Sequence, residues 1–305
     1  MTSSIIQENL KRDFVGYGMR PPKVIWPNDS KIAVQLVVNF EEGAENSVEK
    51  GDKMPEQLGD FPPIDLPVRD LGLESVFEYG SRVGIWRMLD LFDSLEVKTT
   101  FFACGEALEC NPEAAREIVR RGHEVCSHGY RWYEHFRWTE EQSRQDIRKA
   151  VESIKRTTGE RPVGWYCREP GVQVRKLLVE EGGFIYDSDA YNDEIPYYVR
   201  VGGKNHLVVP YTSDCNDFHY WTGKFNTSES FFQYLKDSFD VLYAECTRKN
   251  PRMMSIGTHV RISSKPGRIG AIERFIRYAK GFERVWFARR DEIARWWLKN
   301  YPPPE

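Results

Sequence analysis

Short apolar segments alternate with segments of helical periodicity along nearly the whole chain. Residues 32–38 are apolar except for Gln35, the pattern of a strand that is buried on both faces. Further strands are predicted at 99–103, 123–127, 163–167, 184–187, 207–210, 254–258 and 285–288. Helices are predicted at 75–95, from Asn111-Pro112-Glu113 onward, and at 139–157, 174–181, 228–246, 272–280 and 291–298.

The alternation of strands and helices predicts a parallel sheet with right-handed crossovers. Residues 1–30 look irregular, and no break in composition divides residues 31–300, so a single domain is expected there. Several strand ends converge on one place more readily in a barrel than in an open sheet. The pattern therefore favours an α/β fold, a distorted (β/α) barrel of about seven parallel strands. No glycine-rich phosphate loop follows a strand, which disfavours a nucleotide-binding fold.

Two adjacent carboxylates, Glu41 and Glu42, directly follow the first predicted strand. Because a strand interior rejects charge, we expect these acids to face a cleft at the carboxyl ends of the strands, where α/β folds bind ligands. His128 follows a middle strand and His259 follows a late strand. If these strands are parallel neighbours, the four side chains form one constellation. A helix cap with solvated acids, and histidines with structural hydrogen bonds, are the plain alternatives.

The composition is that of a globular protein without a strong charge of either sign. Of the 305 residues, 40% are hydrophobic and 29% are charged, and the formal net charge is -3. This balance gives no reason to expect nucleic acid or a membrane surface as a partner. The sequence shows no segment of transmembrane length, no signal peptide and no regular spacing of its six cysteines. We therefore expect reduced thiols, a cytoplasmic location, a homo-oligomer and a small-molecule or oligosaccharide substrate.

The order of the motifs resembles that of the polysaccharide deacetylase family, which includes chitin deacetylases. An acidic pair follows a strand, Gly122-His123-Glu124 leads to His128, Gly164-Trp165-Tyr166 follows, and a late strand ends at His259. The resemblance covers roughly residues 30–300 and is closest to the branch that contains allantoinases. Stretches typical of that branch are 13–18, 79–82, 127–132, 232–237 and 286–290. The resemblance implies hydrolysis of a C–N amide bond other than a peptide bond.

The resemblance also implies roles for individual residues. Glu41 matches the family's general base and Glu42 its acidic metal ligand, although the family usually has aspartates there. His128 matches the first metal-binding histidine, whereas Trp132 stands where the second is expected and cannot ligate a metal. His259 matches the general acid. A divalent metal such as zinc or cobalt is therefore expected to bind weakly or not at all, and which glutamate is the base stays open.

Further residues are candidates for substrate binding. Trp132, Trp165 and Tyr166 could form walls around a sugar or hydantoin ring, or they could pack in the core. Arg168 and Glu169 lie where allantoinases of the branch usually carry Thr-Gly-Arg, and Glu169 falls at the position of that arginine. On extended backbone these two neighbours point to opposite faces. Asp187 and Asp189 follow another predicted strand and could orient a base or bind substrate hydroxyls.

Three functions are open on this basis. N-deacetylation of an N-acetylated amino sugar, as in chitin or chitooligosaccharides, is favoured by a small margin, because Glu169 reverses the charge expected of an allantoinase. Opening of the hydantoin ring of allantoin is almost equally supported, by the branch resemblance and the missing secretion signal. A catalytically silent scaffold is the remote alternative, and the presence of both acids and both histidines argues against it.

Overall fold

The computed structural model of the protein describes residues 6–8, 12–246 and 250–303. The strands are β1 (Ile6–Glu8), β2 (Ile32–Phe40), β3 (Thr100–Ala103), β4 (Glu124–Ser127), β5 (Gly164–Trp165), β6 (Tyr186–Asp187), β7 (Tyr197–Val201), β8 (Lys204–Val208), β9 (Arg252–His259) and β10 (Val285–Phe287). The α-helices are α1 (Leu71–Tyr79), α2 (Ile85–Ser94), α3 (Gly105–Cys110), α4 (Pro112–Arg120), α5 (Glu140–Thr158), α6 (Val174–Glu181), α7 (Ser228–Glu245), α8 (Val260–Ser263), α9 (Pro266–Lys280) and α10 (Arg290–Asn300). Shorter helical turns are η1 (Pro27–Asp29), η2 (Val48–Lys50), η3 (Gly80–Gly84), η4 (His135–Arg137) and η5 (Asp217–Tyr220).

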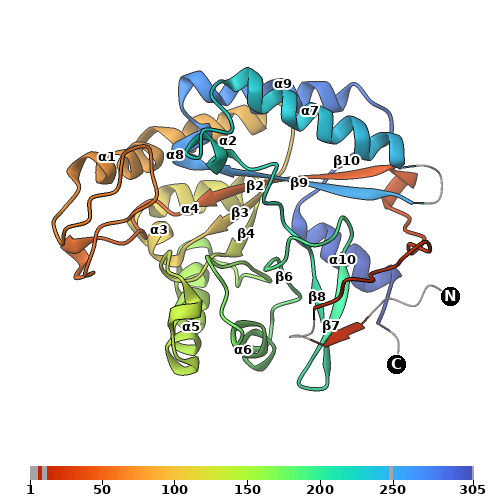
Figure 1. The fold of residues 1–305 in the computed structure, drawn as a ribbon, viewed down its shortest axis with the longest axis horizontal. Coiled ribbons are helices and arrows are strands. Elements are labelled where there is room, and N and C mark those ends of the chain that lie inside the picture. Colours follow the sequence, from red (N-terminus) through yellow and green to blue (C-terminus); the bar gives the residue numbers. More distant parts are fainter. Residues whose placement is uncertain (1–5, 9–11, 247–249, 304–305) are drawn as a thin grey trace.

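The strands form one curled, mostly parallel sheet (Figure 1). Its strands follow the order β2–β3–β4–β5–β6–β8, β9 and β10 both pair with β2 in parallel, and the antiparallel hairpin of β7 and β8 carries β1 at its outer edge. The curl brings β9 near the segment that follows β8, and an isolated bridge joins Asn216 to Gly257 there. We call this boundary between β9 and the segment after β8 the seam. This half-barrel with helices between its strands confirms the predicted α/β barrel fold.

β2 is the central strand because its side chains are apolar on both faces. All nine of its residues are buried, and it pairs with β9 along almost its whole length. Gln35, the polar exception, accepts a hydrogen bond of 2.6 Å from Nη1 of Arg290 at the start of α10. Arg290 also donates to the carbonyl oxygen of Pro210 at 2.8 Å and to the hydroxyl of Ser255 at 3.0 Å. Its guanidinium group therefore ties β2 to both sides of the seam.

The helices cover the curled sheet in two groups. α7 and α9 pack together above β2 and β9, and α5 lies with α3 and α6 on the other side (Figure 1). The helix predicted at 75–95 is divided, because the π-helical turn η3 separates α1 from α2. A Cβ atom at Gly80 would lie 2.6 Å from Oε1 of Glu42, so the glycine allows this turn to approach the acidic pair.

Two predicted strands are shorter than their apolar segments. β5 and β6 have two residues each. The N–H of Tyr166 still donates to the carbonyl of Ser127 in β4 at 2.9 Å, but the N–H of Cys167 donates to Oδ1 of Asp189 at 2.9 Å instead of to a neighbouring strand. The segment at 207–210 contributes to β8, the second arm of a hairpin whose first arm, β7, the apolar pattern did not predict.

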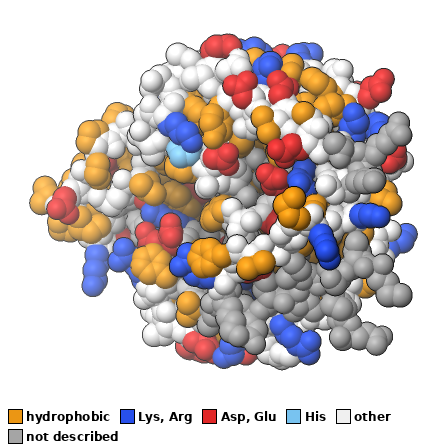
Figure 2. All heavy atoms as spheres, turned by 45° about the vertical axis from the view of Figure 1, so that its right-hand side comes forward, with side chains coloured by type: hydrophobic (Ala, Val, Ile, Leu, Met, Phe, Trp, Pro, Cys, Tyr) orange, Lys and Arg blue, Asp and Glu red, His pale blue; other side chains and the backbone are white. Residues whose placement is uncertain are grey.

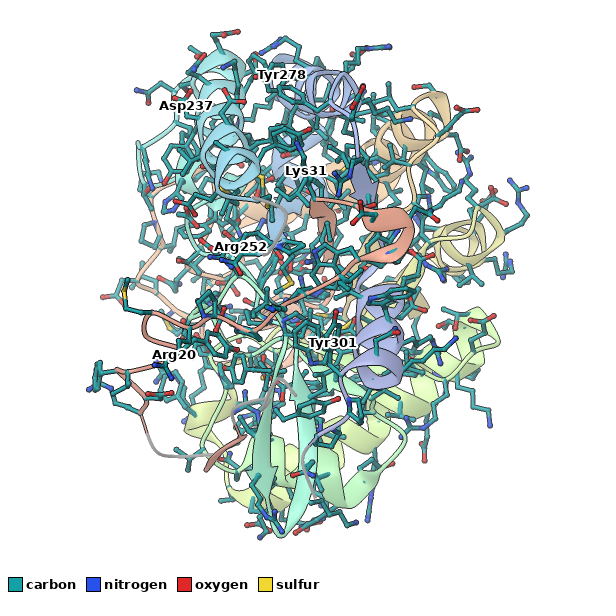
Figure 3. All side chains as sticks on the ribbon, turned by 90° about the vertical axis from the view of Figure 1, so that its right-hand side faces the viewer. Arg20, Lys31, Asp237, Arg252, Tyr278 and Tyr301 are labelled. Atoms are coloured by element: carbon teal, nitrogen blue, oxygen red, sulfur yellow. The ribbon has the colours of Figure 1, made fainter. Side chains whose placement is uncertain are left out.

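The N-terminal segment is attached to α10 and to the hairpin. β1 pairs with β7, so part of the segment predicted to be irregular is a strand, whereas residues 1–5 and 9–11 lie outside the described residues. The backbone N–H of Ile25 donates to the hydroxyl of Tyr301 at 2.5 Å, and the indole of Trp296 donates to the carbonyl of Ile25 at 2.8 Å. Figure 3 shows Tyr301 beside α10.

The surface carries no strong charge asymmetry on the face drawn in Figure 2, where acidic and basic side chains are intermixed. This mixture agrees with the small net charge of -3. Within residues 6–8, 12–246 and 250–303, none of the helices has the length and apolar character needed to cross a bilayer.

Candidate active site

Three of the predicted site residues converge at the carboxyl ends of β2, β4 and β9. The pairing of β2 with β9 sets His259 beside Asn39, two residues before Glu41. Oε1 of Glu41 lies 3.1 Å from Nε2 of His128 and 3.8 Å from Nε2 of His259. All three side chains are shielded from solvent, with exposed fractions of 0% for Glu41, 2% for His128 and 8% for His259. Glu41 is the group at which the two histidines meet.

His259 is held by a second carboxylate, Asp217, at the first residue of η5. The Nδ1–H of His259 donates to Oδ1 of Asp217 at 2.6 Å, and its backbone N–H donates to Oδ2 at 2.8 Å. The hydroxyl of Ser263 also donates to Oδ2 of Asp217, at 2.6 Å. Asp217 fixes the orientation of the imidazole and keeps a proton on Nδ1, so Nε2, which faces Glu41, is the nitrogen that gains or loses the second proton. Asp217 follows the predicted strand at 207–210, and the sequence leaves open whether the acids there orient a catalytic base, bind substrate hydroxyls or are solvated.

Arg261, which sequence reasoning missed, places a buried positive charge against both glutamates. Its Nη1 donates to Oε2 of Glu41 at 2.7 Å and lies 3.7 Å from Oε1 of Glu42. The backbone N–H groups of Glu41 and Arg261 donate to Oε2 and Oε1 of Glu42, at 2.9 and 3.0 Å. Glu42 therefore uses both oxygens to hold the backbone, whereas Glu41 faces the histidines. This arrangement favours Glu41 over Glu42 as the reactive carboxylate.

Aromatic rings surround the guanidinium group of Arg261. Its Cζ lies 4.2 Å from the ring centroid of Phe77, 5.0 Å from that of Trp132 and 5.2 Å from that of Trp221. The Nε and Nη2 atoms of Arg261 are buried and have no hydrogen-bond partner within the described part of the chain. These two atoms form the side-on fork of the guanidinium, so the edge that does not bind Glu41 presents two free donors.

The buried charges set distinct protonation states. Burial opposes ionisation of Glu41, but Arg261, His259 and His128 outweigh it and hold the pKa of Glu41 far below its usual range. Burial also disfavours a charged His259, yet Asp217 and Glu41 raise its pKa above the ordinary value. Burial lowers the pKa of His128, and it raises the pKa of Glu42 to about 7. The surroundings therefore favour the ionised form of Glu41, the protonated form of His259 and the neutral form of His128.

The residues of the site do not fit a tightly held divalent metal. Among the described residues, no group of three or more histidine, cysteine, aspartate or glutamate side chains is placed to ligate an ion. Both oxygens of Glu42 already accept backbone N–H groups, and Nη1 of Arg261 occupies the space between the two carboxylates. Trp132 cannot replace the missing ligand. The positive charge that a metal would bring to Glu41 comes here from a guanidinium group.

The three predicted aromatic walls lie in different places. Trp132 borders the site, where its ring packs between the guanidinium groups of Arg261 and Arg168, at 5.0 and 4.0 Å. Tyr166 packs against the ring of His128 with centroids 4.9 Å apart. Trp165 is fully buried, 5.8 Å from the ring of Phe184, which favours the alternative of core packing over a wall role. Adjacent residues at the end of β5 point to opposite faces, and only Tyr166 faces the histidine.

Arg168 and Glu169 have different surroundings. Arg168 lies inward, and its guanidinium contacts the carboxylates of Glu56 at 2.9 Å and Glu134 at 3.1 Å. Glu169 is exposed and has a positive φ of 48°. The structure thus places a guanidinium group beside Trp132 even though the arginine typical of the allantoinase branch is absent. The negative charge of Glu169 lies in solvent.

The two predicted aspartates belong to a neighbouring network. Asp187 is fully buried, and its carboxylate accepts hydrogen bonds from Arg175 at 2.7 Å and contacts Nε2 of His206 at 2.9 Å. Arg175 and His206 already pair with the carboxylate of Asp187, so the substrate-binding role predicted for Asp187 is not supported. Asp189 accepts the N–H of Cys167 at 2.9 Å, and burial together with the charge of Asp187 raises the pKa of Asp189 to about 8. Asp189 thereby shapes the loop that follows Tyr166.

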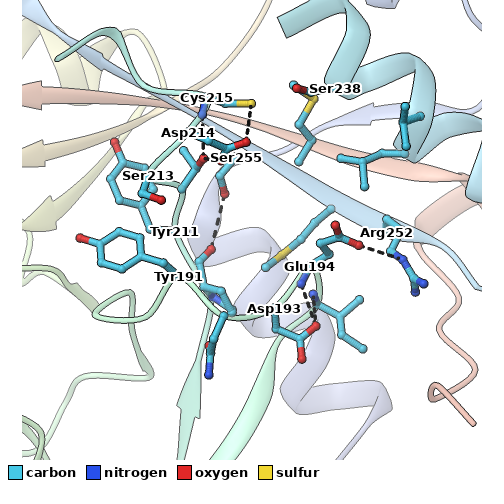
Figure 4. A pocket seen from close by; sticks show the side chains of 18 of the residues that line it. Tyr191, Asp193, Glu194, Tyr211, Ser213, Asp214, Cys215, Ser238, Arg252 and Ser255 are labelled. Atoms are coloured by element: carbon cyan, nitrogen blue, oxygen red, sulfur yellow. Dashed lines mark hydrogen bonds and ion pairs between the residues drawn. The ribbon is translucent and has the colours of Figure 1, made fainter. Parts of the chain in front are cut away.

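A cavity of about 1000 Å³ lies elsewhere, at the seam between β9 and the segment that follows β8. Figure 4 shows Asp214 and Ser255 on one side of it and Glu194 on the other, where Glu194 pairs with Arg252 at 3.1 Å. None of Glu41, His128 and His259 lines this cavity. The enclosed cluster of Glu41, His128 and His259 and this cavity are separate features.

Comparisons with known proteins agree with this geometry. Residues 72–180 match the family model described as polysaccharide deacetylase. A Schizosaccharomyces pombe protein named as a polysaccharide deacetylase is 37% identical over 95% of this chain and 98% of its own length. Two crystal structures superpose with TM-scores of 0.92 and cover 96% of this chain and 99% of theirs: a Pseudomonas aeruginosa protein described as a polysaccharide deacetylase, at 47% identity, and Puue allantoinase, at 44%. The chain therefore belongs to the polysaccharide deacetylase family, and it is an amide hydrolase of that family.

Proposed function

We propose that this hydrolase opens a ring C–N amide bond of a small cyclic ureide, the kind of reaction named by its allantoinase relative. The observation that carries the proposal is the enclosure of the reacting groups: the side chains of Glu41 and Arg261 are buried, and the rings of Phe77 and Trp221 pack against the guanidinium group of Arg261. Such a site suits a compact planar molecule better than a polymer chain. The 44% identity with Puue allantoinase over 96% of the chain supports the same choice.

N-deacetylation of an acetylated amino sugar is the second candidate. It is supported by the polysaccharide deacetylase match at residues 72–180 and by the Schizosaccharomyces pombe relative. The same catalytic groups would serve both reactions, since each attacks an amide carbonyl with water. The two candidates differ in how much of the substrate has to fit beneath the rings.

In the proposed mechanism, Glu41 orients a water molecule and takes its proton as the water attacks the amide carbonyl carbon. The free fork of Arg261 stabilises the oxyanion that forms on the carbonyl oxygen. His259 then passes its Nε2 proton to the leaving nitrogen as the C–N bond breaks. The developing negative charge on the oxyanion partly neutralises the effect of Arg261 on Glu41. The pKa of Glu41 therefore rises during the attack, and the carboxylate becomes a better base.

The proposal is tested by turnover of purified protein against allantoin, hydantoin and N,N′-diacetylchitobiose. We expect ring opening of at least one cyclic ureide at a rate well above that of deacetylation. Release of acetate from the chitobiose with no ring opening would establish the second candidate. No hydrolysis of any of the three would favour the remote alternative of a silent scaffold.

Substituting Asp217 with asparagine should move the alkaline limb of the kcat profile to lower pH. Asp217 raises the pKa of His259, and the protonated imidazole is the proposed acid, so activity falls as pH rises through that pKa. Removing one charge in direct contact should shift the limb by about 1–3 pH units. The matched control is Asp214→Asn, since Asp214 bonds to Thr212 and Tyr234 instead of His259. An unshifted limb with a uniformly lower rate would make Asp217 a purely structural residue.

The remaining expectations stay predictions. We infer a homo-oligomer and a cytoplasmic location from the sequence, and a small molecule as partner from the enclosed site. Weak or absent binding of zinc or cobalt is supported by the position of Arg261 between the carboxylates. Size-exclusion chromatography with light scattering would give the oligomeric state directly.

A further inference from the structure

Trp221 covers the catalytic acid and the guanidinium fork. Its ring centroid lies 6.2 Å from that of His259 and 5.2 Å from Cζ of Arg261. It directly follows η5, so the short helix that begins with Asp217 also positions this indole. Unlike Glu41 and Arg261, Trp221 is partly exposed, and a molecule that enters from solvent can reach it.

The hydrogen-bonding groups around Trp221 are incomplete. Its indole Nε1 is buried and has no acceptor within the described residues, and the same holds for Nε and Nη2 of Arg261. Buried donors without acceptors are costly and rare, so each calls for an explanation. Because all three atoms are hydrogen-bond donors, a molecule that pairs with them has to supply oxygen acceptors. Two separate donor groups, on two residues, require more than one acceptor position.

We propose that Trp221 selects substrates that carry a second carbonyl group beside the scissile amide, by donating its indole N–H to that carbonyl. The inference rests on the proposed function and names the residue that reads the substrate. In a cyclic ureide such as hydantoin, a ring nitrogen lies between two carbonyl groups. One carbonyl can meet the fork of Arg261 while the other accepts from Trp221. An acetamido group has a single carbonyl and leaves the indole unpaired, so Trp221 discriminates between the two candidate substrate classes.

Equilibrium binding tests the inference without turnover. Calorimetry would compare hydantoin, with two ring carbonyls, and 2-pyrrolidinone, with one, on Glu41→Gln protein with and without Trp221→Phe. Phenylalanine keeps an aromatic ring but lacks the donor. We expect hydantoin to bind about tenfold more weakly to the double variant, with 2-pyrrolidinone unchanged. The matched control is Trp296→Phe, which removes an indole donor that bonds to Ile25, far from the site, and should change neither affinity.

Three results would overturn the inference: unchanged hydantoin affinity, equal weakening of both ligands, or no hydantoin binding by the Glu41→Gln protein. Equal weakening would show that the indole acts by packing alone. The wild-type turnover assay separates this failure from failure of the proposed function. If wild-type protein opens no ureide ring but the binding difference is present, the reaction assignment fails and the recognition role stands. If the ring is opened and Trp221→Phe leaves KM for hydantoin unchanged, the recognition role fails alone.

Discussion

Replacing Glu41 with glutamine is expected to lower kcat about a thousandfold while substrate affinity changes little. The carboxylate lies 3.1 Å from His128 and 3.8 Å from His259, at the point where a water molecule would be activated. Glutamine has the same shape but cannot take up a proton. Because only the transition state needs that proton transfer, kcat should fall much more than binding.

Glu45→Gln is the matched control for this experiment. Glu45 lies in the same turn and accepts the backbone N–H of Gly43 at 2.7 Å, a bond that the amide oxygen of glutamine can preserve. Its kcat should stay close to that of the wild type. If Glu41→Gln retained a tenth or more of the wild-type kcat, the base would have to be sought elsewhere, first at Glu42. The measurement is steady-state kinetics on the substrate that the panel identifies.

Replacing Arg261 with methionine should destabilise the fold by about 3–5 kcal/mol at pH 8, because it leaves a buried carboxylate without its cation. Glu41 and Arg261 are both fully buried and share a bond of 2.7 Å. Methionine fills similar volume but carries no charge. Arg261→Lys is the matched comparison, since it restores charge without the fork. It should recover much of the stability and little of the activity.

The loss of stability in Arg261→Met should be smaller at acidic pH. In the wild type the depressed pKa of Glu41 contributes stability that is present above its unfolded-state pKa and is lost as pH falls through the folded-state pKa. Without Arg261, burial favours the protonated carboxyl, and protonation then relieves the unpaired charge. Urea unfolding at pH 8 and pH 5 would show this difference. Equal destabilisation at both values would mean that Arg261 acts through its packing against Phe77 and Trp132.

The sequence was informative where burial on both faces forces a pattern. Residues 32–38 and 254–258 became the paired central strands β2 and β9, and their register brings His259 next to Glu41. Polar connections were harder to place, because their structure depends on contacts between distant residues. Asp217 lies at the first residue of the short helical turn η5, and its bond to His259 spans 42 positions.

Arg261 escaped prediction for a related reason. In the sequence it is one of many arginines and follows a strand, where a solvent-exposed position is usual. Its burial is explained by its ion pair with Glu41, which lies 220 positions away in the sequence. The choice between a wall role and core packing at Trp165 is a local one: adjacent residues at a strand end point to opposite faces, so Trp165 and Tyr166 do not share one. At Arg168 and Glu169 the rule does not apply, because Glu169 has a positive φ of 48° and the backbone there is not extended.

The central claim is that a guanidinium group supplies the positive charge beside the catalytic carboxylate, where other family members are expected to hold a metal. The most direct measurement is turnover of wild-type protein before and after exhaustive dialysis against a chelator, with the metal content of both samples determined by elemental analysis. The arrangement of Arg261 between Glu41 and Glu42 predicts unchanged kcat and less than a tenth of a metal ion per chain after dialysis. Loss of activity on dialysis, with recovery on adding one equivalent of zinc or cobalt, would contradict it.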